Sequence, residues 1–199
     1  MIRALVLTLL LALPAAAQDL PDWQHTSIND FAGVLSNEDV QILDQALIAL
    51  HDDTGVEGTV VTLTDRARYG GADGLEPFAT RLFNHWGVGD AERNDGFMVL
   101  VLTGDREVRV ELGAGYPRSA DRIAARIIDD TILPDFRAGN LSRGIREGTL
   151  DVIQQIARPH AAGETLAGRP GRMTDWLIPA GGRVSEVVEI GWRRNLRVN

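Results

Sequence analysis

Apolar residues recur at helical spacing in separate stretches of the chain, and each stretch has recognisable ends. After Ser36, which can cap a helix with Asp39 at capping-box spacing, the residues Val40, Leu43, Ala46, Leu47 and Leu50 share one face, and Gly55 ends the helix. Asp73 and Glu76 repeat the capping spacing before a second helix that stops ahead of Trp86-Gly87. A third helix is predicted from about Ala120 to Thr131, with Pro134 beyond it, and a fourth from about Leu141 to Ala157.

Three other stretches read as strands. Val56 to Leu63 and the almost wholly apolar Phe97 to Leu102 fit buried strands, and Val108 to Leu112 alternates apolar and charged residues. The first two strands flank a helix, so they should be parallel with a right-handed crossover, whereas the tight turn Thr103–Arg106 makes the third strand antiparallel. The pattern predicts an α/β fold with a mixed sheet between helices, closed by residue 157.

The two ends of the chain read differently from this core. Arg3, an apolar run from Ala4 to Leu13 and the small residues Ala15-Ala16-Ala17 form a cleavable signal peptide over 1–17, which predicts a periplasmic or secreted protein beginning at Gln18. The folded domain is then expected over 18–157. Residues 158–199 are expected to form a tail containing Gly, Pro and Arg, with one strand predicted at Val184 to Ile190, and no later segment is long and apolar enough to span a membrane.

Composition removes several classes of function. The chain has 28 acidic and 20 basic residues, a formal charge of −8, which argues against nucleic acid as a partner. Every basic residue is Arg, so the lysine of a P-loop and Schiff-base chemistry are excluded. The absence of Cys excludes thiolate nucleophiles and thiolate zinc sites, and the His residues lack zincin spacing.

Polar residues gather in two Gly-rich loops that the predicted hairpin places at one sheet edge. Phe97 begins one strand and Leu112 ends its antiparallel partner, so the loops 87–96 and 113–121 must emerge together. Their hard oxygen donors would suit calcium or magnesium; they are Asp90, Asn94, Asp95, Glu111 and Asp121. Structural roles in turns, at a helix start or on a solvated strand explain each residue equally well. An EF-hand is excluded, because Val101 stands at its twelfth position.

Several segments, in this order along residues 29 to 155, together resemble the TPM domain. The family includes thylakoid lumen proteins tied to photosystem II repair, exported bacterial proteins and a nematode acetylcholine-receptor accessory protein. The matching segments are Asn29-Asp30-Phe31-Ala32-Gly33-Val34-Leu35-Ser36, Asn84-His85-Trp86-Gly87-Val88-Gly89, Asn94-Asp95-Gly96, Val108-Arg109-Val110-Glu111-Leu112-Gly113-Ala114-Gly115, Asp121 with Arg126-Ile127-Ile128, and Pro134-Asp135-Phe136-Arg137-Ala138-Gly139.

The resemblance implies a three-layer α/β/α sandwich, an acidic calcium-binding cleft and, as in plant members, acid phosphatase activity. Carried over to this chain, it implies a ligand set of Asp30, Asn94, Asp95, Glu111 and Asp121. Two departures stand out. The family more often has Asp-Asn-Gly where this chain has Asn94-Asp95-Gly96, and the region Tyr116-Pro117-Arg118 replaces a common acid.

Two hypotheses follow. In the first, the protein is an exported phosphomonoesterase in which calcium or magnesium on Asp95, Glu111 and Asp121 polarises the phosphoryl group and activates water. Arg118 would offer a guanidinium fork to the phosphate, so the expected catalytic residues are Asp95, Asp121 and Arg118. In the second, the same cleft holds calcium without catalysis and docks a membrane-protein segment during assembly, repair or regulation.

Overall fold

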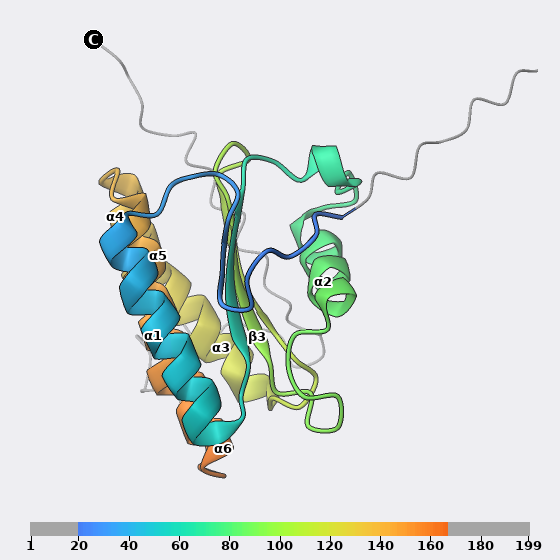
Figure 1. Ribbon diagram of the computed structural model, residues 1–199, viewed down its shortest axis with the longest axis vertical. Coiled ribbons are helices and arrows are strands. Elements are labelled where there is room, and N and C mark those ends of the chain that lie inside the picture. The colour runs from blue at the N-terminus through green and yellow to red at the C-terminus, as the bar shows by residue number, and fades with distance from the viewer. Residues whose placement is uncertain (1–19, 167–199) are drawn as a thin grey trace, which may run out of the picture.

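The computed structural model describes residues 20–166. A four-stranded sheet with the order β1-β2-β3-β4 runs through the centre of the molecule (Figure 1). Its strands are β1 (Ile28–Asp30), β2 (Gly58–Leu63), β3 (Phe97–Leu102) and β4 (Glu107–Leu112). The first three strands are parallel and β4 pairs antiparallel with β3. Both the βαβ unit and the hairpin predicted from the sequence are therefore confirmed.

Helices cover both faces of this sheet unequally, which confirms the three-layer α/β/α sandwich. On one face lie α1 (Asn37–Thr54), α3 (Arg118–Ile127), α4 (Leu133–Arg137), α5 (Leu141–Val152) and α6 (Arg158–Ala161), as Figure 1 shows. The other face is covered by α2 (Leu75–Trp86), preceded by the short 3₁₀ turn η1 (Ala67–Tyr69). The two faces are called below the α1 side and the α2 side.

Side chains of the central strands alternate between the two sides, and both sides are filled. Val60 and Val99 pack on the α1 side, whereas Val61 and Met98 pack on the α2 side. Every residue of β3 is buried, as expected for a strand covered on both faces. In the edge strand β4 the α1 side is apolar, but Glu107, Arg109 and Glu111 occupy the alternate positions.

Helix capping follows the sequence at α1 but not at α2. Ser36 caps α1 by accepting a hydrogen bond from the Asp39 amide at 3.1 Å, and Gly55 ends it in the left-handed conformation. The predicted capping of α2 by Asp73 is wrong, since Gly74 is its N-cap and Asp73 pairs with Arg81. The long guanidinium of Arg81 offers this carboxylate a charged partner.

The Asp39 carboxylate joins α1 to α5. It accepts hydrogen bonds from the Ser142 hydroxyl and the Arg146 guanidinium. Burial of this carboxyl acts to raise its pKa, but hydrogen bonds from Ser142, Arg146 and Ser36 outweigh burial and lower the pKa. The carboxylate is therefore better stabilised in the folded protein than in the unfolded chain.

Two prolines lie inside helical structure, each directly after a π-helical turn. The turns are Ile128–Ile132 and Ile153–Ala157, and they precede Pro134 in α4 and Pro159 in α6. Proline removes a backbone donor and its ring crowds the carbonyl four residues earlier, so a wider turn before it relieves that clash. The prediction that the third helix ends before Pro134 is wrong for this reason, and the fourth helix likewise continues past Ala157.

Strand β1 is absent from the sequence-based prediction because three residues show no periodicity. It forms by pairing with β2, with Ile28 opposite Val60 and Asp30 opposite Thr62. The predicted signal peptide (1–17) and the predicted strand Val184–Ile190 lie outside the described residues. Within residues 20–166, no helix combines the length and the apolar character needed to cross a membrane.

Candidate functional site

The two Gly-rich loops meet at one edge of the sheet, as the hairpin predicts; they lie at the lower end of the molecule in Figure 1. The Gly113 amide donates to the Gly96 carbonyl at 2.9 Å, and the Gly115 amide donates to the Asn94 carbonyl at 2.8 Å. A Cβ on Gly115 would lie 2.0 Å from the Arg93 carbonyl oxygen, so only glycine permits this approach. The contact region formed by residues 93–96 and 113–116 is called the loop junction below.

Asp95 is the buried carboxylate of the loop junction, with 3% of the residue exposed. Its Oδ2 accepts a hydrogen bond from Arg93 Nε at 2.6 Å. Its Oδ1 is buried and has no hydrogen-bond partner among the described residues. A buried carboxylate oxygen without a donor is costly, so this atom marks a place where a donor or a cation would be accommodated.

Tyr116 brings a second buried polar atom to the junction. Its hydroxyl also lacks a hydrogen-bond partner within residues 20–166, and its ring lies 4.4 Å from the ring of His160. Burial raises the pKa of the Tyr116 phenol, and the negative charge of Asp95 raises it further. The hydroxyl therefore stays protonated near Asp95, where it offers a donor and two acceptor lone pairs.

Asn94 and Asp90 lie in the same loop but hold the turn together. Asn94 is exposed with a positive φ of 50°, and its side chain donates to the Ala91 carbonyl at 3.3 Å. The Asp90 carboxylate accepts from the amides of Glu92 and Arg93 at 3.0 and 2.8 Å, and these bonds lower its pKa. Asn94 directly precedes Asp95 in the sequence, whereas the Asp90 carboxylate is occupied by backbone amides of its own turn.

Glu111 lies at the same sheet edge but on the opposite face. It pairs in register with Met98, which packs on the α2 side, and its Oε1 accepts from the Thr80 hydroxyl of α2 at 2.7 Å. Its Oε2 pairs with Arg109. Asp95 instead lies beside Tyr116, which packs on the α1 side. The sheet therefore separates these two predicted ligands.

Asp121 and Arg118 lie in the first turn of α3, beside the edge strand β4. Both residues are exposed as whole residues, but the surrounding protein partly removes water from the Asp121 carboxyl. This desolvation raises the pKa of Asp121, Arg109 partly offsets it, and the charge of Glu111 raises it again. Asp121 is therefore within electrostatic range of Arg109, Glu111 and Arg118 around the start of α3.

Asp30 lies at the other end of the sheet. Its carboxylate accepts from the amides of Val34 and Leu35 at 3.1 and 2.9 Å and from the Thr62 hydroxyl, which fixes the turn into α1. Asp30 pairs with Thr62 of β2, and Thr62 pairs with Val101 of β3. Val101 lies near the opposite end of β3 from Phe97. Four strand residues correspond to about 13 Å. Asp30 is therefore far from Asp95, which precedes Phe97.

The structure thus brings the predicted loops together but divides their carboxylates. Within residues 20–166, no group of three or more His, Cys, Asp or Glu side chains lies close enough to hold a metal ion. The five residues come from different elements: Glu111 in β4 faces α2, Asp95 lies in the loop before β3, Asp121 lies in α3 and Asp30 is in β1. Of the expected five, Asp95 and Asn94 lie at the loop junction, Glu111 and Asp121 lie within electrostatic range of each other near β4, and Asp30 is separate.

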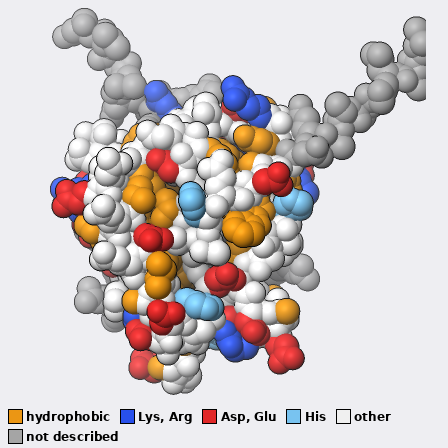
Figure 2. Space-filling model, in the orientation of Figure 1, with side chains coloured by type: hydrophobic (Ala, Val, Ile, Leu, Met, Phe, Trp, Pro, Cys, Tyr) orange, Lys and Arg blue, Asp and Glu red, His pale blue; other side chains and the backbone are white. Residues whose placement is uncertain are grey.

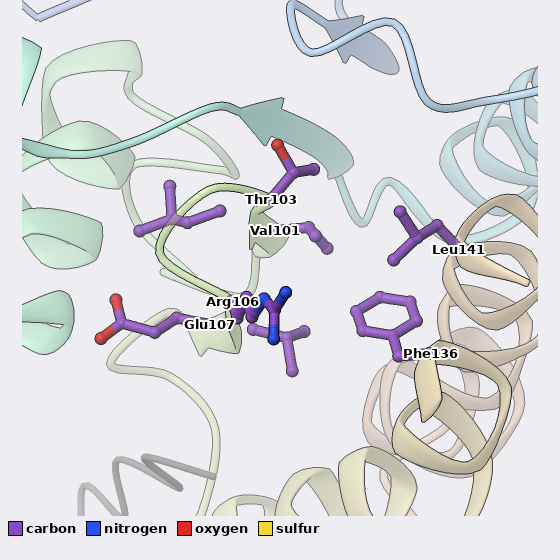
Figure 3. A pocket seen from close by; sticks show the side chains of 8 residues that line it. Val101, Thr103, Arg106, Glu107, Phe136 and Leu141 are labelled. Atoms are coloured by element: carbon purple, nitrogen blue, oxygen red, sulfur yellow. The ribbon is translucent and has the colours of Figure 1, made fainter. Parts of the chain in front are cut away.

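A small cavity lies at the opposite end of the strands from the loop junction, between the β3–β4 hairpin and the helical layer. Its volume is about 10 Å³, roughly what one water molecule requires. Figure 3 shows Phe136 and Leu141 on the helical side, across from Arg106 of the hairpin turn. This cavity is too small for a phosphomonoester and lies away from the loop junction.

Two arginines are functional candidates that the sequence analysis missed. Arg93 pairs with Asp95, and Arg109 pairs with Glu111. Arg109 stands two residues before Glu111 in strand β4, and that spacing places both side chains on one face, so this pair could be predicted from the sequence. Arg93 also stands two residues before Asp95, but Asn94 between them has a positive φ, so strand alternation does not account for this pair.

Acidic side chains are otherwise dispersed on the face that Figure 2 shows, with basic side chains among them toward the lower end. On that face the acidic side chains are not collected into one patch.

Comparisons with known proteins agree with this architecture. The family model for the TPM domain matches residues 28–155. The N-terminal domain of a protein from P. gingivalis is similar in structure, with a TM-score of 0.58 and 33% identity over 71% of this chain and 87% of that chain. The N-terminal domain of a protein from Corynebacterium glutamicum has a TM-score of 0.51 and 10% identity, over 76% of this chain and 88% of that chain, which shows the fold alone. No curated protein gives a significant match.

Proposed function

This chain belongs to the TPM domain family, and from that premise we propose that it is a divalent-cation-binding domain whose binding site is the loop junction. The observation that carries the proposal is Asp95 Oδ1, a buried carboxylate oxygen without a hydrogen-bond partner in the described part of the chain. Bound calcium would neutralise this oxygen.

The residues at the junction fit a hard cation. Asp95 would supply the charged ligand, and the Tyr116 hydroxyl, which lies within electrostatic range of Asp95, and the side-chain oxygen of the adjacent Asn94 are candidate neutral ligands. Calcium accepts a mixture of carboxylate, carbonyl and water oxygens, and it tolerates irregular geometry. Zinc prefers thiolate and imidazole groups, and the chain has no Cys. Calcium is therefore favoured over zinc, with magnesium as the alternative hard ion.

The bound cation would act structurally, by holding the loops 87–96 and 113–117 together at the sheet edge. Calcium would add to the backbone hydrogen bonds that already join the loops, and a docking surface for a membrane-protein segment formed by their outer side chains would then be stabilised by the ion.

A second candidate function is phosphomonoester hydrolysis, since the family model carries the name TPM phosphatase. In that case the cation would polarise the phosphoryl group, Asp95 would hold the cation, and Arg118 and Asp121 of α3 would bind and orient the phosphate and the attacking water. The binding function is favoured because Asp95 already supplies a reason to bind a cation, whereas Asp121 lies with Glu111 around β4.

Calcium titration of the purified protein tests the proposal, with thermal unfolding and calorimetry as readouts. Calcium should raise Tm in the wild type, since a ligand that binds only the folded state stabilises it. Asp95→Asn should abolish the shift. Asp73→Asn is the matched control, because it removes a charge from another Asp–Arg pair, outside the loop junction. A missing shift in the wild type, or an equal shift in Asp95→Asn, would refute the site.

Hydrolysis of an aryl phosphate separates the two functions. The binding function predicts no turnover at any pH with either calcium or magnesium. Turnover that is lost in both Asp95→Asn and Asp121→Asn would instead establish the phosphatase. In that case Arg118→Ala should chiefly raise KM, because the guanidinium would bind the phosphate.

Export is part of the proposal. The pattern over residues 1–17 supports cleavage before Gln18 and a periplasmic or secreted location. Intact-mass analysis of the protein from the cell envelope should give the mass of residues 18–199. A species that retains Met1 would contradict cleavage.

A further inference from the structure

Arg93 bridges the proposed cation site and the end of α1. Its Nε donates to Asp95 Oδ2 at 2.6 Å, and its Nη2 donates to the Gly55 carbonyl at 2.7 Å. Gly55 is the left-handed residue that ends α1. The arginine side chain is 48% exposed, while the Asp95 side chain is 5% exposed. A half-exposed guanidinium thus covers a buried carboxylate from the solvent side.

We propose that Arg93 is a tethered competitor for the cation site, which holds the Asp95 carboxylate when no divalent ion is bound and lowers the affinity for that ion. The inference rests on the proposed function and identifies how its site is regulated. Arg93 balances the charge of Asp95 through Oδ2 only, so Oδ1 is left without a hydrogen-bond donor among the described residues. The guanidinium must move away or remain beside the incoming ion.

Both outcomes, a guanidinium that stays beside the ion and one that moves away, make cation binding less favourable. A doubly charged ion and a guanidinium about 5 Å apart repel each other enough, even at the dielectric constant of water, to change an affinity about tenfold. If the guanidinium moves away, the Gly55 carbonyl at the end of α1 loses this hydrogen bond from the loop. The exposed carboxylate of Asp90, 4.0 Å from Arg93 Nη1, provides a nearby place for the released guanidinium. Cation binding is therefore linked to release of the end of α1.

The test compares the calcium affinity of the wild type, Arg93→Gln and Arg93→Lys by calorimetry. Arg93→Gln removes the charge and should bind calcium at least tenfold more tightly. Arg93→Lys keeps the charge and should stay within threefold of the wild type. Arg81→Gln is the matched control, because Arg81 also pairs with one Asp and donates to the carbonyl of a helix-ending glycine, Gly70, while its side chain is 41% exposed. Its affinity should equal that of the wild type.

Thermal unfolding without calcium gives a second readout. Arg93→Gln should lower Tm in a chelator, because it leaves the buried carboxylate without its counter-charge. Calcium should then raise Tm by more than it does in the wild type. A Tm that falls equally with and without calcium would overturn the competition, since Arg93 would then act only as a structural contact.

The outcomes distinguish this inference from the proposed function. Equal affinities of Arg93→Gln and the wild type, with binding lost in Asp95→Asn, would overturn the competition and leave the cation site standing. Binding by Arg93→Gln but not by the wild type would support the competition and refute calcium binding as the wild-type function. If neither protein binds calcium, both proposals fail.

Discussion

Gly115→Ala tests how closely the two loops approach, which is the structural basis of the proposed site. A Cβ at this position would lie 2.0 Å from the Arg93 carbonyl oxygen and 2.9 Å from the Asn94 carbonyl oxygen. Ordinary contact distances begin near 3.4 Å. Both obstructing atoms belong to the backbone, so a rotamer change cannot relieve the clash, and one loop must move by more than 1 Å.

The expected cost combines two effects. Overpacking a well-packed site costs about 1–3 kcal/mol, and separation of the loops also removes the bond from the Gly115 amide to the Asn94 carbonyl, worth about 1 kcal/mol. The free energy of unfolding should therefore fall by about 2–4 kcal/mol, which lowers Tm by about 10 °C for a domain of this size. Urea unfolding followed by circular dichroism measures the first quantity, and calorimetry measures the second.

Gly139→Ala provides the comparison. Gly139 has a φ of 84° and no atom within 4 Å of its Cβ position, so its substitution carries only the backbone strain of about 1 kcal/mol. Hydrogen exchange adds a local readout, because the amide of residue 115 should exchange faster in Gly115→Ala than in the wild type. If Gly115→Ala costs no more than Gly139→Ala and leaves this exchange unchanged, the loops do not meet as described, and the argument for the junction fails.

Three other substitutions test the electrostatics of the fold. Asp39→Asn should lower the free energy of unfolding by about 1–2 kcal/mol at pH 7. Because folding lowers the pKa of Asp39, the stability that its carboxylate contributes is present above the unfolded pKa and is lost as pH falls through the folded pKa. The urea unfolding curves of the variant and the wild type should therefore converge in acid. Tyr116→Phe should raise stability by about 1 kcal/mol in urea without calcium, because it removes a buried hydroxyl without a partner among the described residues; a loss would mean that this hydroxyl is hydrogen-bonded. Asp121→Asn should raise Tm slightly at pH 7 in a chelator, because folding raises the pKa of Asp121 and its ionised carboxylate therefore destabilises the folded state above that pKa. The gain in Tm should shrink as pH falls. A lower Tm of the variant at pH 7 would contradict a raised pKa.

Local periodicity was sufficient to predict most of the elements and their order. The apolar face of α1, its Ser36 cap and its Gly55 end were all readable, because helix formation there depends on residues within a few positions of one another. The buried run of β3 and the alternation of β4 predicted their antiparallel pairing, and this pairing placed the two loops at one edge. The ordered segments also identified the family.

Elements that depend on distant partners were missed or misplaced. Strand β1 has three residues and exists because β2 pairs with it, so no local pattern could reveal it. The sequence predicts that helical structure ends near Pro134 and Pro159, but a π turn before each proline allows the helix to continue.

For the candidate site, too, the sequence predicts some features and only the tertiary structure shows the others. The sequence by itself determined that Asn94, Asp95, Glu111 and Asp121 lie near one edge of the sheet, because strand direction fixes where loops emerge. Only the tertiary structure decided that Asp95 is buried on the α1 side beside Tyr116, that Glu111 contacts α2, and that Asp30 caps a turn at the far edge. The physical reason is that topology brings loops together, whereas the direction and burial of each side chain depend on which helix covers each face and which arginine reaches each carboxylate.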